Sequence, residues 1–165
     1  VWAGAQAGRN LDRVRARIAA AEQRWQRPSG SVALLAVSKT RPIEDLLQAY
    51  ACGQRAFGEN YLQEAEAKMA ELADLDILWH FIGRIQGNKT RPIAEHFHWV
   101  HGLASAKHAR RLSEQRPGHM PPLQVCLQVN LSDEASKGGI EPAQLAALAR
   151  AVATQIGRAS CRERV

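Results

Sequence analysis

Aromatic residues and cysteines are scarce in this chain of 165 residues. Aromatic side chains make up 5% of the sequence, and there are three cysteines. Cys52, Cys126 and Cys161 are widely spaced and form no CxxC pair, which argues against both a disulfide framework and a zinc site built on paired cysteines. A reducing, cytoplasmic setting is therefore expected.

The chain also lacks a long apolar run. A membrane-spanning helix needs about 20 consecutive apolar residues, and no segment approaches that length. The first residues contain no basic stretch followed by an apolar one, so no signal peptide is expected. An apolar share of 45% and a charged share of 23% exclude a disordered or collagen-like chain, and the length suits one globular domain.

The basic excess, a formal net charge of +6, is confined to the two ends of the chain. Residues 1–31 contain six arginines against two acidic residues, and residues 158–165 contain three arginines against Glu163. Between these segments, 13 basic side chains balance 13 acidic ones. Because a protein that follows a phosphate backbone needs a basic stripe on its folded body, no nucleic-acid partner is expected.

Hydrophobic patterning predicts one leading helix and five strand–helix units. The leading helix covers residues 8–27 and ends at Pro28-Ser29-Gly30; its apolar residues recur at spacings of three and four, at Leu11, Val14, Ile18, Ala21 and Trp25. Strands are predicted at 32–37, 55–58, 77–82, 97–101 and 123–131. Helices are predicted at 42–52, 60–73, 88–96, 105–115 and 142–156. The first strand is apolar throughout, which is typical of a strand buried on both faces of a parallel sheet.

This alternation predicts an α/β fold with a parallel sheet and right-handed crossovers. Two architectures fit: a doubly wound open sheet and a (β/α)8 barrel. No GxGxxG motif follows the first strand, which weakens the dinucleotide-binding version of the open sheet. A barrel needs eight units and about 250 residues, so five units do not close it.

The end of the chain differs from the rest. After Ile156 the apolar periodicity stops and arginines become frequent. Residues 158–165 are therefore predicted to be a non-native tail, and residues 1–157 the N-terminal part of a single domain. We expect the natural chain to continue beyond residue 157 with a different sequence.

Lys39 is the most informative candidate for a functional residue. It directly follows the apolar run at 32–37, and ligand sites of parallel α/β folds lie at the carboxyl ends of the strands. Desolvation there would favour the neutral amine, the form that forms a Schiff base with an aldehyde cofactor. The alternative is a lysine that only caps the strand and keeps its ammonium group in water.

A second copy of the local sequence provides an internal control. Residues 39–43 and 89–93 both read Lys-Thr-Arg-Pro-Ile. Lys89 follows Gln86-Gly87-Asn88 instead of an apolar strand, so it is expected in the first turn of a helix, facing solvent. The repeat is interpreted as similar loop sequence and not as a repeat of the fold.

Polar residues and glycines near the ends of the other strands are further candidates. Asn60 follows the second strand and either faces the pocket mouth or serves as a helix N-cap. His80 alternates with large apolar residues, so it is either a hydrogen-bonded core residue or a site residue. Gly83 and Asn88 lie in a plausible ligand loop whose glycine spacing matches no phosphate-loop motif, and Asn130 lies near the end of the fifth strand.

Other polar residues are expected to have no site role. Lys137, in a glycine-bounded loop, is expected to be solvated. His96, His98 and His101 are spaced by two and three residues, which matches no HExxH pattern. No metal site is predicted.

Five segments together resemble the pyridoxal phosphate homeostasis protein family, also called PLP-binding proteins. They are Val37-Ser38-Lys39-Thr40, Phe57-Gly58-Glu59-Asn60-Tyr61, Trp79-His80-Phe81-Ile82-Gly83, Gln86 through Lys89, and Asn130 through Gly138. The resemblance runs in order from about Leu11 to Ile156. It implies an alanine-racemase-like (β/α)8 barrel, of which this chain contains about the first five units.

The resemblance also implies a function. Family members are cytosolic, bind and release pyridoxal 5'-phosphate (PLP) for vitamin B6 homeostasis, and largely lack robust catalysis, with PLP-dependent enzymes as possible recipients. The family's Schiff-base lysine aligns with Lys39, and the residues predicted to line the site with it are Asn60, His80, Gly83, Asn88 and Asn130. The family's later units, which supply most of the phosphate contacts, do not match this chain, and strand five is expected to have an open edge. A racemase-like PLP enzyme and a PLP-independent α/β protein remain alternatives.

Overall fold

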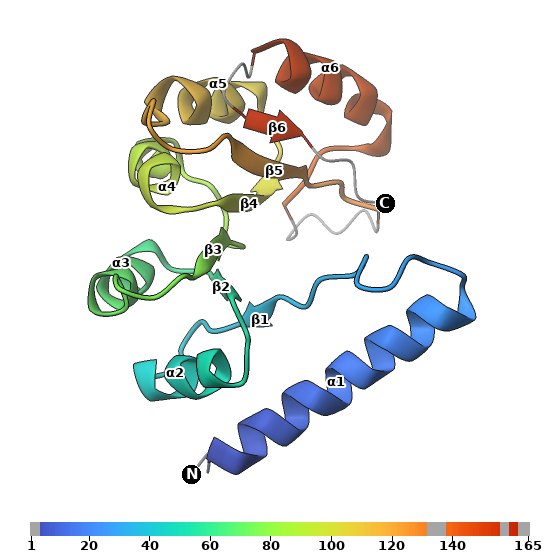
Figure 1. Ribbon diagram of the computed structural model, residues 1–165. Helices are drawn as coiled ribbons and strands as arrows, with labels where there is room; N and C mark the ends of the chain where they lie inside the picture. Colours follow the sequence, from blue (N-terminus) through green and yellow to red (C-terminus); the bar gives the residue numbers. More distant parts are fainter. Residues whose placement is uncertain (1–3, 132–137, 156–158, 162–165) are drawn as a thin grey trace.

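The computed structural model describes residues 4–131, 138–155 and 159–161 (Figure 1). Its elements run from an N-terminal helix through alternating strands and helices. Within these residues, none of the helices has the length and apolar character that a membrane crossing requires.

Six parallel strands form one sheet in the order β1-β2-β3-β4-β5-β6. The strands are β1 (Ala36–Val37), β2 (Ala56–Glu59), β3 (Leu78–Phe81), β4 (Trp99–Leu103), β5 (Leu123–Leu127) and β6 (Ala159–Cys161). The helices are α1 (Gly4–Arg24), α2 (Ile43–Ala51), α3 (Leu62–Glu71), α4 (Thr90–His96), α5 (Ala106–Gln115) and α6 (Leu145–Gln155), with 3-10 turns at Gly87–Lys89 and Pro142–Gln144. The five predicted strand–helix units are confirmed.

The strand order decides between the two predicted architectures. Each strand pairs with the next one in the sequence, and right-handed crossovers then place successive helices on the same face of the sheet. Figure 1 shows α2, α3, α4 and α5 along one side of an arc of strands. A doubly wound sheet reverses its strand order and carries helices on both faces, so the structure is an arc of a (β/α) barrel.

Side chains along each strand point alternately to the two faces of this arc. Phe57, Trp79, Phe81 and Val100 point toward the helices and are buried, where they pack with helix residues such as Ile93 in the hydrophobic core. Their strand neighbours, including His80, point to the concave face. This period of two is the expected consequence of the pleat.

The first strand differs from the prediction. The regular strand covers only Ala36–Val37, and it pairs with β2 alone. Val32 is 39% exposed and Val37 is 54% exposed, so the prediction of burial on both faces is wrong. Because β1 is the edge of the described sheet, no neighbouring strand covers its other side.

The opposite edge also differs from the prediction. The edge of β5, expected to be open, is paired in parallel with β6, with Leu123 opposite Ala159 and Val125 opposite Cys161. β6 lies within residues 158–165, the segment predicted to be a non-native tail. Backbone N–H and C=O groups form such a ladder with little dependence on sequence. The pairing therefore does not test whether residues 158–165 are native, and their non-native origin stays a prediction.

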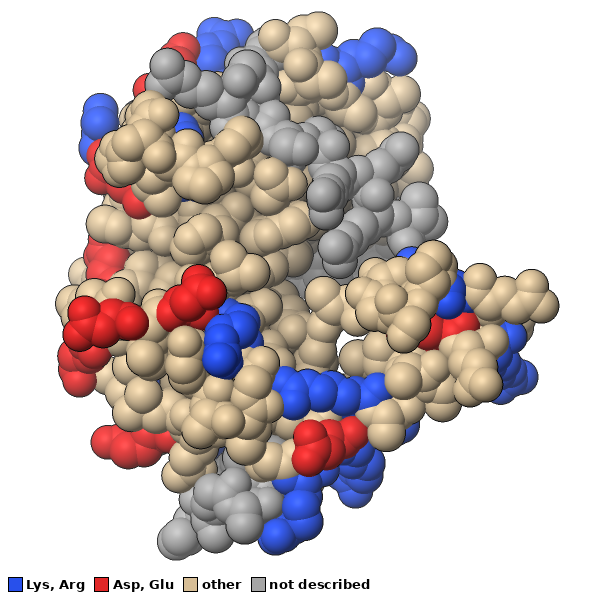
Figure 2. Space-filling view, viewed as in Figure 1, with Lys and Arg blue, Asp and Glu red and all other residues tan. Residues whose placement is uncertain are grey.

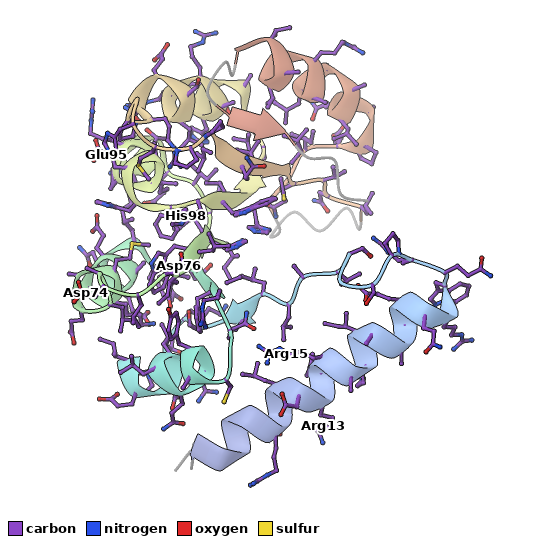
Figure 3. All side chains as sticks on the ribbon, viewed as in Figure 1. Arg13, Arg15, Asp74, Asp76, Glu95 and His98 are labelled. Atoms are coloured by element: carbon purple, nitrogen blue, oxygen red, sulfur yellow. The ribbon has the colours of Figure 1, made fainter. Side chains whose placement is uncertain are left out.

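Helix α1 packs less closely than its apolar pattern predicts. Its apolar residues Leu11, Val14 and Ile18 are only half-buried, and Trp25, expected on the buried face, is 70% exposed because it lies beyond the helix end. Arg15 faces the sheet and Arg13 lies on the other side of the helix (Figure 3). Other Lys and Arg side chains gather on the surface around α1, as Figure 2 shows.

Glu22 fixes the loop after α1. Its carboxylate accepts hydrogen bonds from the backbone N–H groups of Gly30, at 2.9 Å, and Val32, at 2.7 Å. These two bonds hold the pKa of Glu22 below its usual value, because they stabilise the charged carboxylate. The chain therefore returns to the sheet at a defined place.

His98, after α4, predicts a pH dependence of stability. Its Nδ1 accepts the Trp79 backbone N–H at 3.0 Å. Burial lowers the pKa of His98; the nearby Arg116 adds to this effect, while Asp76 opposes it (Figure 3). The unfolded chain then binds more protons than the folded one at mildly acidic pH, so stability falls as the pH drops below the ordinary histidine value of about 6.5.

Urea unfolding at pH 7.5 and 5.5 checks this expectation. We expect a lower free energy of unfolding at pH 5.5, and a smaller difference between the two pH values in His98→Gln. His108, whose pKa burial also lowers, should contribute the remaining slope. An unchanged slope in His98→Gln would contradict the role given to His98.

Candidate functional site

Lys39 lies where the sequence predicts it, directly beyond the carboxyl end of β1. Its side chain is exposed among the described residues, so the predicted burial is not observed there. Within the same residues, Lys39 makes no ion pair or side-chain hydrogen bond. The next residue, Thr40, has a φ of 60°, a left-handed conformation that is uncommon outside glycine and that turns the chain sharply after Lys39.

A buried polar network lies beneath this turn. Lys68 of α3 is 4% exposed, and its Nζ donates to the Ser38 carbonyl at 2.8 Å and to Glu59 Oε1 at 2.8 Å. The Ser38 hydroxyl donates to the same Glu59 oxygen at 2.6 Å, and Glu59 is fully buried. The residue before Lys39 is thus held by both its backbone and its side chain.

Glu64 holds the residue after Lys39. Its Oε1 accepts the Thr40 backbone N–H at 2.6 Å and the Lys68 ammonium at 2.7 Å. Burial opposes the ionisation of Glu64, but the bonds from Lys68 and Thr40 outweigh it and lower its pKa. The network of Ser38, Glu59, Glu64 and Lys68 therefore fixes the backbone on both sides of Lys39.

The role of this network was not predicted from the sequence. Charged residues on a helix rich in alanine and glutamate are usually solvated, and Lys68 gave no reason to expect otherwise. The available signal is the spacing of Glu64 and Lys68, which places them on one helix face at i and i+4. Glu59 at the end of a buried strand is the second signal, because a buried carboxylate needs a partner.

Asn60 and Gly83 meet at the ends of β2 and β3. A Cβ placed on Gly83 would lie 2.3 Å from the Asn60 carbonyl oxygen and 3.1 Å from its Oδ1. This close backbone approach requires glycine. The structure therefore brings these two predicted site residues together, and it explains Gly83 by packing against the neighbouring turn.

A cavity of about 300 Å³ opens beside these two turns. Asn60 lines it together with Lys89. Lys89 was expected to face solvent from a helical turn; it lies instead at the end of the 3-10 turn, half-buried, and borders this cavity. The predicted site residue Asn88, in the same turn, is exposed and is not among the lining residues.

His80 lies elsewhere, on the concave face of the sheet. It is 8% exposed, its Nδ1 is 2.9 Å from His101 Nε2, and its ring stacks on Trp99 with centroids 5.5 Å apart. These three side chains line a second cavity, of about 210 Å³, with Cys126. The structure therefore gives His80 the environment of a hydrogen-bonded interior residue and does not place it beside Asn60 and Lys89.

Asn130 lies beyond the end of β5. Its backbone N–H donates to the Ile140 carbonyl at 2.8 Å, and the Gln128 side chain donates to the Gly138 carbonyl at 3.0 Å. These bonds join the chain just after β5 to the segment at Gly138 and Ile140. Lys137, expected to be solvated, lies outside the described residues.

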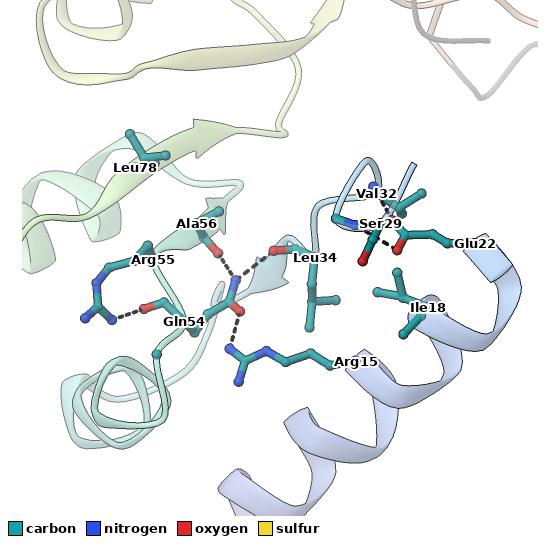
Figure 4. A pocket seen from close by; sticks show the side chains of 13 residues that line it. Arg15, Ile18, Glu22, Ser29, Val32, Leu34, Gln54, Arg55, Ala56 and Leu78 are labelled. Carbon is teal, nitrogen blue, oxygen red and sulfur yellow. Dashed lines mark hydrogen bonds between the residues drawn. The ribbon is translucent and has the colours of Figure 1, made fainter. Parts of the chain in front are cut away.

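Another cavity, of about 450 Å³, lies between α1 and the amino ends of β2 and β3 (Figure 4). Its polar groups are engaged in structural bonds. Arg15 donates to the Cys52 carbonyl at 2.8 Å and to Gln54 Oε1 at 3.3 Å, and the Gln54 amide donates to the carbonyls of Leu34 and Ala56. The residues around this cavity hold α1 against the sheet, at the end of the strands opposite to Lys39.

No group of three metal-ligating side chains occurs in the segments that the structure describes. The polar groups at the carboxyl end of the sheet are amines, amides and hydroxyls, with Glu59 and Glu64 both bound to Lys68. This set suits an organic ligand with carbonyl and oxyanion groups better than it suits a metal ion.

Comparison with known proteins supports the fold. Residues 9–161 match the family described as the alanine racemase N-terminal domain. The chain belongs to this family. A solved alanine racemase from Corynebacterium glutamicum has a similar fold, with a TM-score of 0.55 at 18% identity over 76% of this chain and 36% of the racemase.

Closer relatives confirm the resemblance found in the sequence. The pyridoxal phosphate homeostasis protein of Pseudomonas aeruginosa is 62% identical over 87% of this chain, and that of Escherichia coli K12 is 48% identical over the same share. The structure of PipY from Synechococcus elongatus with PLP bound has a TM-score of 0.72 at 42% identity, covering 87% of this chain and 66% of PipY. This chain spans 62% and 63% of the length of the two curated relatives.

Proposed function

We propose that this protein binds PLP at the carboxyl end of its sheet, with Lys39 as the residue that bonds to the cofactor. One observation carries the proposal: the Lys39 amine lies at the end of β1, without an ionic partner among the described residues, on a backbone that the buried network holds on both sides. The PLP-bound structure of PipY supports the same ligand class.

The residues present fit part of the cofactor. PLP supplies an aldehyde carbon, which a primary amine attacks when it is neutral. Lys39 offers that amine, and no carboxylate competes for it in the described residues. Asn60 and Gly83 pack closely against each other in the turns after β2 and β3. This contact holds the two turns in place at the edge of the sheet where Lys39 lies.

The proposed role is that of a carrier without robust catalysis, acting in vitamin B6 homeostasis and passing PLP to PLP-dependent enzymes in the cytoplasm. The names of the curated relatives support this role. A racemase also needs a strong base aligned with the substrate Cα–H bond. Glu59 and Glu64, the carboxylates of the network that holds the backbone beside Lys39, are both bound by Lys68.

Borohydride trapping with limiting PLP, followed by peptide mapping, tests the proposal. We expect one predominant reduced adduct at Lys39, which is lost in Lys39→Ala and retained in the matched variant Lys107→Ala, since Lys107 is exposed on α5. The same protein incubated with L-alanine should yield no D-alanine above the blank.

Three results would contradict the proposal. Adducts spread over Lys68, Lys89, Lys107 and Lys137 would indicate ordinary aldehyde chemistry on lysines in general. An adduct pattern unchanged in Lys39→Ala would remove Lys39 from the site. Robust production of D-alanine would favour the racemase alternative over the carrier.

A further inference from the structure

The cavity of about 300 Å³ between the β2–α3 turn and the β3–α4 loop has a composition that no structural role explains. Its polar lining consists of three side-chain amides, one phenol and two cations: Asn60, Gln63, Gln86, Tyr61, Arg84 and Lys89. Among the residues that the structure describes, no carboxylate contributes to the lining. The cavity is thus lined by hydrogen-bond donors and positive charge at the carboxyl edge of the sheet.

The two cations are available to a ligand. In the part of the chain that the structure describes, neither Arg84 nor Lys89 makes an ion pair or a side-chain hydrogen bond. The nearby carboxylate of Glu64 is already bound by Lys68 and by the Thr40 backbone. By contrast, Arg91 on the same segment pairs with Glu95 at 3.6 Å.

Part of the cavity lining is apolar. Leu62 and Phe81 line it and are buried, at 8% and 3% exposed. A guanidinium and an ammonium in the same lining as two buried apolar side chains match a ligand with a phosphate at one end and an apolar group at the other. The size also suits a small molecule, since ligand pockets begin at about 300 Å³.

We propose that this cavity binds a small phosphate monoester, with Arg84 and Lys89 contacting the phosphate and the amides of Gln63 and Gln86 completing its hydrogen bonds. Lys39 is not among the residues that line this cavity, and the proposal does not depend on PLP binding at Lys39. The apolar part of the ligand lies against Phe81 and Leu62.

Titration of the ¹⁵N-labelled protein with inorganic phosphate and with phenyl phosphate tests the proposal, each against sodium chloride at the same ionic strength. We expect saturable amide shifts at Gln63, Arg84 and Lys89, with phenyl phosphate binding more tightly than inorganic phosphate. Arg84→Gln/Lys89→Gln should weaken binding at least about tenfold, since each charge-assisted hydrogen bond contributes that much or more. Arg91→Gln/Lys107→Gln is the matched control and should leave binding unchanged, as should Lys39→Ala.

Shifts that do not saturate, or that sodium chloride reproduces, would overturn the site. Equal weakening of phosphate binding in the Arg91→Gln/Lys107→Gln control would mean that the loss of net positive charge, and not the loss of a specific site, causes the effect. Loss of phosphate binding in Lys39→Ala would place the phosphate at the proposed PLP site instead of in this cavity. Equal affinity for the two probes would overturn the apolar contact and with it the monoester assignment.

Discussion

Replacing Lys68 with methionine should lower the free energy of unfolding by about 3–5 kcal/mol, the cost of removing one partner from a buried ion pair. Glu59 is fully buried and shares its Oε1 between Lys68, at 2.8 Å, and the Ser38 hydroxyl, at 2.6 Å. Without Lys68, its negative charge has no compensating cation. Since small domains have a total stability of about 5–15 kcal/mol, this is a large share.

Urea unfolding, followed by tryptophan fluorescence, to which the buried Trp79 contributes, measures the effect. Lys107→Met is the matched control, because it removes the same chemical group from an exposed helix position and should change stability by less than about 0.5 kcal/mol. If Lys68→Met does not fold, Lys68→Arg, which keeps the charge, should fold with a smaller loss. Equal effects of Lys68→Met and Lys107→Met would contradict the importance of the network.

A double mutant separates loss of the charge pair from loss of packing. Glu59→Gln removes the buried negative charge, so Glu59→Gln/Lys68→Met should be more stable than the sum of the two single effects predicts, by at least about 1 kcal/mol. Additive effects would mean that Glu59 and Lys68 stabilise the protein independently. Both members of the pair also bind Ser38, the residue before Lys39, so the coupling concerns the backbone that carries the proposed PLP lysine.

The position of Lys39 could be predicted from the sequence because it depends on a general property of the fold. An apolar run followed at once by polar residues marks a strand end, and alternation with helices makes the sheet parallel. The carboxyl ends of its strands then share one edge. The same reasoning predicts Asn60 and Gly83 at that edge, and the structure brings those two residues into contact.

The sequence did not predict features that depend on which segments become neighbours. Whether the run at 32–37 is covered on both sides depends on a strand beyond β1, and Val37 is exposed because the described sheet ends there. Lys68 and Lys89 carry the same charge and both lie in or beside helices, but only tertiary packing buries Lys68 against Glu59 and places Lys89 at a cavity. Charge and periodicity alone do not distinguish these environments from a solvated surface.

Gly83→Ala should lower the free energy of unfolding by about 1–3 kcal/mol, the usual cost of forcing an extra carbon into a packed site. The new Cβ would lie 2.3 Å from the Asn60 carbonyl oxygen, which is backbone and does not rotate away. Because φ at Gly83 is not positive, the cost is steric and not conformational.

The direction of the resulting movement follows from the neighbours of Gly83. Gly102 of β4 lies close on the other side, since a Cβ there would be 3.0 Å from the Gly83 carbonyl oxygen. β3 therefore has little room to shift toward β4, and the turn at Asn60 must move outward. Gly83→Ala should then also weaken the binding of phenyl phosphate in the cavity that Asn60 lines.

Gly87→Ala is the control for this prediction. Its Cβ would meet only Arg111 at 3.5 Å and His108 at 3.7 Å, which are ordinary contact distances to flexible side chains, so stability should change by less than about 0.5 kcal/mol. Urea unfolding of the two variants under the same conditions compares them directly. If Gly83→Ala is as stable as Gly87→Ala and binds phenyl phosphate normally, the contact between Gly83 and Asn60 does not fix this edge of the sheet.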